Sequence, residues 1–568
     1  MRVHVQKESC VLDESKKIID NSILNYLNIS KKATIASIVL IIFVLILEYL
    51  NINSNKNNDE FSNLRLESLP ERKYLVFLVF FVGILITQNV YLNYEVITWD
   101  VPSYLVASQE INAGYLPLET QWESKGPLFL YLYNIISNLV GNSYIHFRLA
   151  NDLILLAITF ILFNIVYKKT NNQLVSTFAG LFFISITSKV WYVSEYSELY
   201  SLFFISSAHL IHLRIRGKYS YLFMGFFLGL STLINQGTIL FLFPFILSYL
   251  FKKTHFIQRV TLLAAGFSMP HVFFLFLYFR RDILDIYIAN YIQLPLAYTK
   301  SSLSSFYELK VWVRGFYDFN SFLYAGLALI IIFFVIETLT NSSFKKKFVT
   351  PEVLGFFISL LLYFIAGHNY YHHLFYFLFF SSLLIIEIIQ NIHIKIILIF
   401  IFISFSTIFL QSSSPAFKNL QDLNQTQENY PLYQLATEID NYLGDSNDNE
   451  ILALDYVLLL YYLEKPNYSY VVHPSNHFDP IVTETLENLK KINNNHISTM
   501  IEEEPRVIIC NPRQIINGNP QRVDSYNCAI ADYKLNYIKI DTLRFKNNQN
   551  LEYYKNPYQT LDLYIREN

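Results

Sequence analysis

The sequence predicts an all-α polytopic membrane domain followed by a small C-terminal α/β domain. The chain of 568 residues is 53% hydrophobic and only 15% charged. Its apolar residues fall into blocks of about 16 to 22, which are long enough to cross a bilayer as helices. After Leu410 the composition changes to Asn, Asp, Glu, Lys and Pro with short apolar runs, which is typical of a soluble domain.

The apolar blocks predict about 11–12 transmembrane helices by their length. Whether the first block spans the membrane or lies at its surface stays open, because a spanning block would leave the basic N-terminal segment outside. The blocks lie near residues 33–50, 74–91, 148–167, 173–190, 198–213, 220–234, 238–251, 260–279, 319–338, 350–366, 371–389 and 396–411.

The basic residues predict which helix ends face the cytoplasm. The loops around Glu195, Asn235 and residues 367–373 are nearly free of Lys and Arg. The positive-inside rule therefore assigns these loops, together with the loop after Trp99, to the outer face. The alternate, cytoplasmic loops carry Lys168 and Lys169; Arg214, Arg216 and Lys218; Lys252, Lys253 and Arg259; Lys345, Lys346 and Lys347; and Lys395.

The chain divides into three expected parts. Residues 1–72 form an N-terminal extension with one extra apolar helix, residues 73–411 form the transmembrane domain, and residues 412–568 form an extracytoplasmic α/β domain. In the last part strand and helix patterns alternate, which predicts a modest α/β layer. The expected strands are 450–455, 468–472, 506–510, 537–543 and 561–565.

Composition narrows the partners. With 43 Lys and Arg against 45 Asp and Glu, the net charge of -2 gives no reason to expect nucleic acid. The three cysteines, Cys10, Cys510 and Cys528, match no metal or redox spacing. Cys510 and Cys528 could pair in an oxidising compartment or remain buried thiols, and the sequence leaves both open.

The first outer loop, residues 92–147, concentrates the side chains that can carry chemistry. Asp100 follows the second apolar block, Lys125 lies within the loop and Arg148 opens the next block. A single carboxylate at the end of a span is often an ordinary interfacial charge. A carboxylate that can take a proton, together with cations that can hold phosphate oxygens, is however the minimum for transferring a group from a phosphorylated lipid.

Four motifs occur in order along this region: W-D-x-P-x-Y from Trp99, I-x-x-G-x-L-P from Ile111, W-x-x-K-G-P from Trp122 and F-R-L from Phe147. Their order resembles the membrane glycosyltransferases of the GT-C superfamily. The branch it resembles most contains the protein O-mannosyltransferases and the aminoarabinose transferase of lipid A. The resemblance extends over the membrane region, from about Tyr74 to Leu410.

The resemblance implies that Asp100 is the catalytic base and that Lys125 and Arg148 contact the phosphate of the donor. It implies an inverting transfer of a hexosyl or pentosyl group from polyprenyl phosphate to a glycan, lipid or protein acceptor. The reaction would take place on the outer face of a bacterial inner or plasma membrane. The family often has an acidic residue after the catalytic Asp and two prolines after the Lys, whereas this sequence has Val101 and Gly126 there.

Two acidic residues on the second outer loop are further candidates for acceptor or sugar binding. Glu195 and Glu198 resemble the second acidic site of the superfamily, which binds acceptor, sugar or a divalent metal. They could equally be first-turn charges of the next helix, near the possible capping residues Ser194 and Ser197.

The remaining candidates lie on other outer turns and on the first loop. The neighbouring His372 and His373 could bind zinc, although a sugar or phosphate contact is favoured. Asn235 and Gln236 could bind sugar hydroxyls or merely cap helix ends. Tyr104 completes the predicted acceptor or sugar site. No cofactor is required by the sequence, and a divalent cation stays open.

Functions of other classes also fit parts of the sequence. A transporter of lipid-linked sugars would have loop charges too, but it should carry ionisable residues near the middle of its spans. A polysaccharide polymerase or ligase would share the compartment and the donor, but its large outer loop usually falls late in the chain. A non-catalytic assembly protein is a third alternative.

Overall fold

The structure is a computed structural model of the whole chain. It describes residues 73–93, 95, 99–188, 195–215, 219–250, 255–301, 350–365, 371–389, 394–443, 450–494, 496–511, 537–546 and 558–566. The apolar block at 33–50 and the expected span at 319–338 lie outside the described residues, so both stay predictions.

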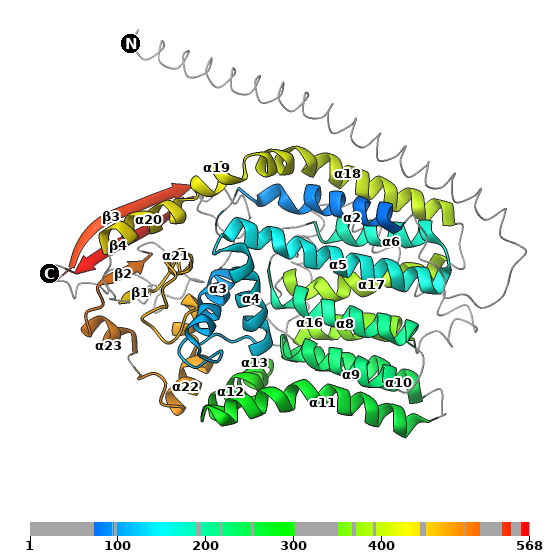
Figure 1. Cartoon of the computed structure of the whole chain (residues 1–568), viewed down its shortest axis with the longest axis horizontal. Coiled ribbons are helices and arrows are strands. Elements are labelled where there is room, and N and C mark those ends of the chain that lie inside the picture. The colour runs from blue at the N-terminus through cyan, green and yellow to red at the C-terminus, as the bar shows by residue number, and fades with distance from the viewer. Residues whose placement is uncertain are drawn as a thin grey trace, which may run out of the picture.

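The body of the protein is a stack of helices that run side by side (Figure 1). Local sequence sets their ends. For example, Asn171 adopts the left-handed conformation that ends one helix, and the side chain of Asn172 accepts a hydrogen bond from Leu174 N (3.0 Å) to begin the next. The helices are α2 (Lys73–Gln88), α5 (Tyr144–Thr170), α6 (Gln173–Ile186), α8 (Ser197–Arg214), α9 (Tyr219–Thr232), α10 (Leu242–Leu250), α11 (Phe256–Arg280), α16 (Pro351–Ile365), α17 (Phe375–Ile389) and α18 (Ile394–Gln421).

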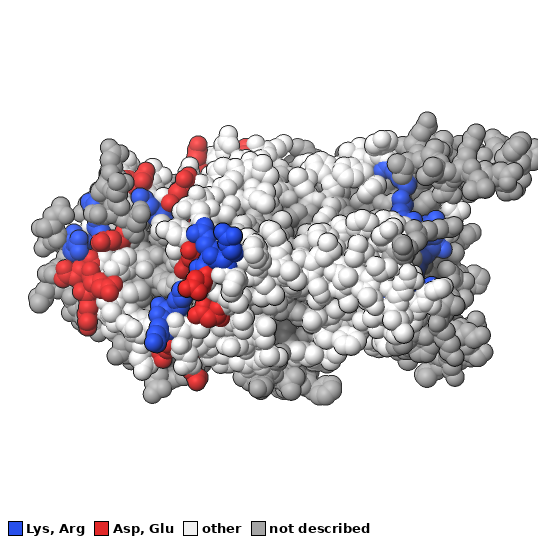
Figure 2. Space-filling view, turned by 60° about the horizontal axis from the view of Figure 1, so that its bottom comes forward, with Lys and Arg blue, Asp and Glu red and all other residues white. Residues whose placement is uncertain are grey.

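The helical body has the properties of a membrane domain. Among the described residues, three helices are long and apolar enough to cross a bilayer, Lys73–Tyr91, Tyr144–Thr170 and Phe256–Arg280, and shorter apolar helices of 10–17 residues accompany them. In Figure 2 a wide band without charged residues separates an end of mixed charge from an end where the visible charges are basic. The protein is therefore an integral membrane protein. The expected number of 11–12 spans stays a prediction.

Buried charges fix the end of the body where α5 finishes. Glu352 in the first turn of α16 contacts Nε2 of His209 at 2.8 Å and forms an ion pair with Lys169 in the last turn of α5. Glu352 and His209 are both about 1% exposed. Because an isolated buried charge is costly, this group joins α5, α8 and α16 at one level.

Helices α9 and α11 pack through glycines. A Cβ on Gly225 would lie 2.0 Å from the carbonyl oxygen of Leu263, and a Cβ on Gly266 would lie 1.9 Å from that of Leu222. Gly225 and Gly229 form a small-xxx-small pattern, which lets helix backbones approach closely in a membrane. The two helices can therefore pack this closely only because glycine has no side chain at these positions.

Short helices cover the opposite end of the body (Figure 1). The expected first outer loop is not irregular throughout, because it contains two α-helices joined by a turn and an extended segment. The short helices at this end of the body, inside and outside the first outer loop, are η1 (Asn89–Tyr91), α3 (Asp100–Gln109), η2 (Glu110–Ala113), α4 (Pro127–Val140), η3 (Gln236–Phe241), α12 (Leu284–Ile288), η4 (Ala289–Gln293), α13 (Leu294–Ser301) and η6 (Tyr371–Leu374).

The C-terminal domain lies against this end and contains a four-stranded sheet in the order β1-β2-β4-β3. β1 and β2 are parallel, and the other two pairs are antiparallel. Four of the expected strands coincide with β1 to β4. The elements are α19 (Leu423–Glu428), α20 (Pro431–Leu443), β1 (Ile451–Ala453), α21 (Leu458–Tyr462), η7 (Pro474–His477), α22 (Pro480–Asn488), α23 (His496–Glu502), β2 (Val507–Cys510), β3 (Tyr537–Lys546) and β4 (Tyr558–Arg566).

Residues 468–472, which were expected to form a strand of this domain, do not form one of its strands, and most of their backbone pairing is with the first outer loop. Trp122 N donates to Tyr470 O (2.6 Å) and Val472 N donates to Trp122 O (3.2 Å). The resulting parallel bridge joins Trp122 to Val471, and both side chains are fully buried in one apolar cluster. At its first residue the segment also contacts the sheet, because Tyr468 N donates to Ile451 O of β1 (2.9 Å). The segment therefore lies between the loop and the sheet.

Two other expectations concern the C-terminal part. Cys510, at the end of β2, is disulfide-bonded, which excludes the free-thiol alternative for this residue. Cys10 and Cys528 lie outside the described residues. Helix α18 continues without a break to Gln421, past the position expected for the start of the C-terminal domain.

The glycine contacts generate a stability prediction. Gly266→Ala should lower the thermal unfolding midpoint of the detergent-purified protein, because the added Cβ must push α11 away from the Leu222 carbonyl. Overpacking of this kind costs about 1–3 kcal/mol. Gly83→Ala is the matched control, since a Cβ there meets the Phe405 ring at an ordinary 3.5 Å. Equal midpoints for Gly266→Ala and wild type would contradict the close packing of α9 and α11.

Candidate active site

The first outer loop is folded around the buried carboxylate of Glu110. Its oxygens accept hydrogen bonds from the backbone N–H groups of Leu118 (2.8 Å), Thr120 (2.8 Å) and Gln121 (3.0 Å). Gly114 makes the preceding turn, because its φ of 85° is the left-handed conformation that favours glycine. Burial raises the pKa of Glu110 to about 7, against the hydrogen bonds that lower it. One carboxylate thus fixes the backbone between α3 and α4.

Lys125 is held at the head of α4 by a close approach of two backbone segments. A Cβ on Gly126 would lie 2.1 Å from the carbonyl oxygen of Leu233. Glycine is therefore required at this position. Asn290 Nδ2 donates to the carbonyl oxygen of Lys125 (3.2 Å). The Nζ atom of Lys125 lies over the ring of Tyr104, 5.5 Å from its centroid.

Asp100 lies in the first turn of α3, and its side chain is 37% exposed. Tyr104 OH donates to Oδ1 at 3.3 Å, and Nε2 of His473 lies 3.3 Å from the same oxygen. Burial would raise the pKa of Asp100. The hydrogen bond and charge of His473, together with the charges of His372 and Lys125, outweigh burial and hold the pKa well below its usual range. Asp100 is therefore ionised at neutral pH.

His473 comes from the C-terminal domain and is not among the site residues predicted from the sequence. Ser475 N–H donates to Nδ1 of His473 (3.2 Å), which assigns the proton of the neutral ring to Nε2, facing Asp100. Burial would lower the pKa of His473, but the hydrogen bond and charge of Asp100 and the charge of Glu123 outweigh it and raise the pKa. The one available signal was a histidine directly after an expected strand.

Glu123 adds a buried carboxylate beside these residues. Its side chain accepts hydrogen bonds from Ser124 N (2.7 Å) and Ser124 Oγ (2.9 Å) through Oε1. Its Oε2 is buried without a hydrogen-bond partner among the described residues. Burial raises the pKa of Glu123, although the charges of His473 and Lys125 lower it. Asp100 and Glu123 therefore have pKa values shifted in opposite directions.

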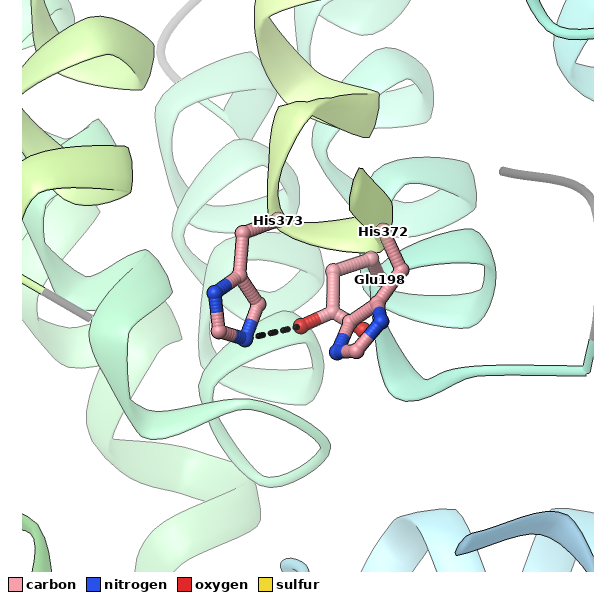
Figure 3. Close-up of side chains that lie close together, drawn as sticks. All are labelled: Glu198, His372 and His373. Atoms are coloured by element: carbon pink, nitrogen blue, oxygen red, sulfur yellow. Dashed lines mark ion pairs between the residues drawn. The ribbon is translucent and has the colours of Figure 1, made fainter. Parts of the chain in front are cut away.

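A second group forms where α8 begins and η6 turns (Figure 3). The side chains of Glu198, His372 and His373 gather there, and one ligand atom from each lies within 4.8 Å of the others. Nε2 of His373 lies 3.9 Å from Oε1 of Glu198. Asn235 Nδ2 donates to the same carboxylate oxygen (3.1 Å). The ring of His372 stacks on the ring of Tyr196, with centroids 4.0 Å apart.

The donor set of this second group fits a divalent cation. Two imidazoles and a carboxylate are the ligands of a zinc site that keeps one position open. In a tetrahedral zinc site the ligand atoms lie about 3.3 Å apart, so the three groups would have to approach from separations of up to 4.8 Å. Ser197 Oγ donates to Oε2 of Glu198 (3.1 Å). Glu198 thus lies in the first turn of α8, as one alternative expected, but its oxygens are oriented by side chains.

Electrostatics link the two groups into one site. Burial raises the pKa of Tyr104 well above its usual value, and the charges of Asp100, Glu123 and Glu198 raise it further. Tyr104 therefore lies close enough to carboxylates of both groups to be affected by their charges. Asn235 joins them from the next outer turn, because its side chain also accepts from Gly237 N (3.2 Å) and begins η3. It is both a helix cap and a contact of Glu198.

The amide nitrogen of Gln236, the neighbour of Asn235, is buried and has no hydrogen-bond partner among the described residues. The structure therefore brings Asp100, Lys125 and Tyr104 together with Glu198 and the two histidines. Glu123 and His473 also belong to this site, although neither was predicted from the sequence.

Arg148 and Glu195 pair with each other instead of joining these groups directly. Nε of Arg148 lies 3.5 Å from Oε1 of Glu195, and both side chains are buried. Nη1 of Arg148 donates to Tyr91 O (2.9 Å). Tyr133 OH donates to the backbone oxygen of Glu195, and its ring packs against the ring of Tyr104. The ion pair is thus connected to Asp100 through two tyrosines.

The chain matches no family model and no curated protein. A solved structure does match: the crystal structure of ArnT from Cupriavidus metallidurans bound to undecaprenyl phosphate aligns over 86% of this chain and 97% of its own, with a TM-score of 0.58 and 10% identity. The apo state of the same ArnT covers the same shares, with a TM-score of 0.43 and 11% identity.

The Archaeoglobus fulgidus oligosaccharyltransferase, in a complex with Zn and sulfate, covers 77% of this chain and 68% of its own, with a TM-score of 0.39 and 13% identity. The alignment with undecaprenyl phosphate-bound ArnT extends over nearly the whole of both chains and carries the fold assignment. The chain therefore has the fold of ArnT, which agrees with the fold that the resemblance to the GT-C superfamily implied.

Proposed function

We propose that the protein is a glycosyltransferase that moves a sugar from a polyprenyl-phosphate donor to an acceptor on the outer face of the membrane. The observation that carries the proposal is the ionised carboxylate of Asp100 near the cation of Lys125, on the first outer loop of a GT-C fold. The ArnT structure with this fold binds undecaprenyl phosphate, which supports a donor of that class.

In the proposed reaction the acceptor hydroxyl or amine attacks the anomeric carbon of the sugar and gives its proton to Asp100. One bond forms between the acceptor atom and the anomeric carbon. The bond between that carbon and the phosphate oxygen breaks, and its electron pair leaves with the polyprenyl phosphate. Lys125 stabilises the negative charge of the leaving phosphate. Attack opposite the leaving group inverts the configuration of the sugar.

Two observations support an extracytoplasmic site. Basic residues lie in the last turns of α5 (Lys168 and Lys169) and α8 (Arg214), at the end of the body opposite to α3. By the positive-inside rule this end is cytoplasmic. The disulfide of Cys510 in the C-terminal domain is typical of an oxidising compartment. A bacterial inner or plasma membrane, with the C-terminal domain outside, agrees with both.

The alternatives differ in how well they agree with these positions. A transporter should have ionisable groups near the middle of its spans, whereas the buried Glu352, His209 and Lys169 group lies where α5 ends and α16 begins. A polymerase or ligase uses the same donor chemistry and differs in its acceptor. The candidate acceptors are a glycan, a lipid and a protein, and the assay with a panel of donors and acceptors identifies both the acceptor and the sugar.

We also propose that Glu198, His372 and His373 bind a divalent cation of the zinc type. The support is the convergence of the three side chains (Figure 3), together with the charge interaction between His372 and Asp100. A bound cation would supply positive charge next to the donor phosphate. Asn235 and Ser197 orient the Glu198 carboxylate through hydrogen bonds to its two oxygens.

Removing the proposed base, Asp100, tests the proposed function. Asp100→Asn should lower the turnover of transfer by roughly 10²–10⁴-fold, the usual contribution of a general base, because the amide keeps the shape but cannot take the proton. The measurement is sugar transfer by purified protein from a panel of radiolabelled polyprenyl-phosphate sugars, with equal expression and membrane insertion of the variant as a check.

Glu119→Gln is the matched control for Asp100→Asn. Glu119 lies in the same loop, but its carboxylate accepts from Leu116 N (2.8 Å) and takes no part in the group around Asp100. It should transfer sugar at the wild-type rate. If wild type and Asp100→Asn consume the donor equally, or neither consumes any, the proposed function is wrong.

Lys125 and Arg148 should differ in their effects. Lys125→Ala should raise the donor KM by about 10- to 100-fold, the worth of a hydrogen bond to a charged group, with an unchanged unfolding midpoint. We also propose that Arg148 contacts the donor phosphate beside its ion pair with Glu195, as the resemblance implies. Arg148→Ala should then raise the donor KM, and it should lower the midpoint because it leaves Glu195 buried without its partner. Adding Glu195→Gln to Arg148→Ala should restore the midpoint but not the KM. An unchanged donor KM for Lys125→Ala would remove Lys125 from the donor site.

The cation site predicts a metal content that does not depend on activity. Wild-type protein equilibrated with zinc and desalted should retain about one zinc ion per chain, as expected for a site of this ligand set. Glu198→Gln and the double variant His372→Ala with His373→Ala should retain far less. His146→Ala, whose Nδ1 lies 2.7 Å from Ser143 Oγ on another outer turn, is the control and should retain the wild-type amount. Equal zinc in all four proteins would refute the site.

A further inference from the structure

The C-terminal domain touches two adjacent residues of the motif that begins α3. Nε2 of His473 lies 3.3 Å from Oδ1 of Asp100, and the Trp99 side chain hydrogen-bonds to the carboxylate of Asp455. The same domain is joined to the first outer loop by the bridge between Trp122 and Val471. The domain is therefore attached to the loop on both sides of the carboxylate.

We propose that His473 is a positioning residue for Asp100, so that the C-terminal domain completes the active site and does more than cover it. The inference rests on the proposed function, in which Asp100 takes the proton of the acceptor. It adds a group from outside the membrane domain to a site that the sequence motifs assign entirely to that domain.

The geometry around Asp100 gives His473 this role. Tyr104, on the same helix, and His473, from another domain, both contact Oδ1 at 3.3 Å, and no described residue hydrogen-bonds to Oδ2. Donors from two separate elements fix the plane of the carboxylate, which a single donor from its own helix would leave free to rotate. Oδ2 is then the oxygen available to the acceptor.

The position of His473 is itself fixed. Ser475 N–H donates to Nδ1 (3.2 Å), and the Trp99 ring meets the imidazole edge-on with centroids 6.3 Å apart. A change of tautomer would therefore lose the hydrogen bond from Ser475, and a rotation of the ring would lose its contact with Trp99. The Asp455 carboxylate that holds Trp99 is in turn bonded to Tyr456 N (2.7 Å), so the arrangement is anchored in the domain.

Charges around His473 determine how the pair should respond to pH. The hydrogen bond and charge of His473 lower the pKa of Asp100 against the effect of burial. Without His473 only the charges of His372 and Lys125 oppose burial, so the pKa of Asp100 rises and a larger fraction of the base is protonated as the pH falls. The groups that face His473 are Asp100, Glu123 and Lys125 on the loop, and Asp455 and His477 on its own domain.

The test compares His473→Ala and His473→Gln with wild type in transfer assays across a range of pH. His473→Ala should lower kcat by about 10- to 100-fold, the cost of misplacing a reacting group, with the donor KM nearly unchanged. Its acid limb should move to higher pH by about one unit or more. His473→Gln keeps a donor in reach of Asp100 and should recover most of the lost kcat, while its acid limb stays above that of wild type.

His477→Gln is the matched control, because His477 lies on the same turn and contacts His496 (3.1 Å) instead of Asp100. It should keep the wild-type kcat and pH profile. An unchanged kcat and acid limb in His473→Ala overturns the proposal. So does an equal loss in His473→Ala, His473→Gln and His477→Gln with lowered unfolding midpoints, which would make the role merely structural.

A double-mutant cycle separates this inference from the proposed function. The unfolding midpoint is measured for Asp100→Asn, His473→Gln and the two changes together, at a pH where Asp100 is ionised. If the side chains interact, the double variant loses less than the sum of the single losses. Additive losses overturn the contact even in a protein without detectable transfer. Coupled losses in a protein that transfers no sugar would refute the proposed function and keep the contact.

Discussion

The outer end of this protein depends on one constraint: a carboxylate buried at a membrane boundary must be given donors. The carboxylates there obtain these donors either from their own loop or from another segment of the chain. Glu110 takes backbone N–H groups of its own loop, and Glu95 accepts from Leu432 N and Tyr433 N at the start of α20 (2.7 and 2.8 Å). Glu195 takes Arg148, and Asp100 takes His473. Satisfying these groups fixes the loop, the helices and the C-terminal domain relative to one another.

The same constraint explains how far the sequence could predict this molecule. The spans follow from hydropathy, so the helices α5, α8 and α11 coincide with predicted apolar blocks to within a few residues at each end. The motif residues Asp100, Lys125 and Tyr104 were identifiable because they follow one another on a single loop. His473 was not, because its role comes from a contact across more than 370 residues, which no local pattern encodes. Arg148 could be located but not its partner, since pairing with Glu195 depends on the packing of two helix ends.

The segment 468–472 illustrates the same limit from the other side. Its alternating apolar residues correctly indicate an extended chain with one buried face, but they do not say which edge it pairs with. The loop supplies one edge through Trp122, and Gln121 adds hydrogen bonds to the backbone oxygens of Asn467 (3.0 Å) and Ser469 (3.3 Å). On the other side, Tyr468 N donates to Ile451 O of β1 (2.9 Å). The W-x-x-K-G-P motif therefore serves two purposes: its Trp holds the C-terminal domain, and its Lys and Gly form the head of α4.

Charge balance in the site suits a donor that is itself an anion. Asp100, Glu123 and Glu198 together would repel a phosphate if all three stood ionised and unpaired. Burial favours the neutral form of Glu123, and His473 and Asn235 hold Asp100 and Glu198. In the proposed reaction Lys125 would then face the donor phosphate with little opposing charge. A phosphate leaves as a stable anion and needs no general acid, so a single carboxylate kept ionised is sufficient for the proposed transfer.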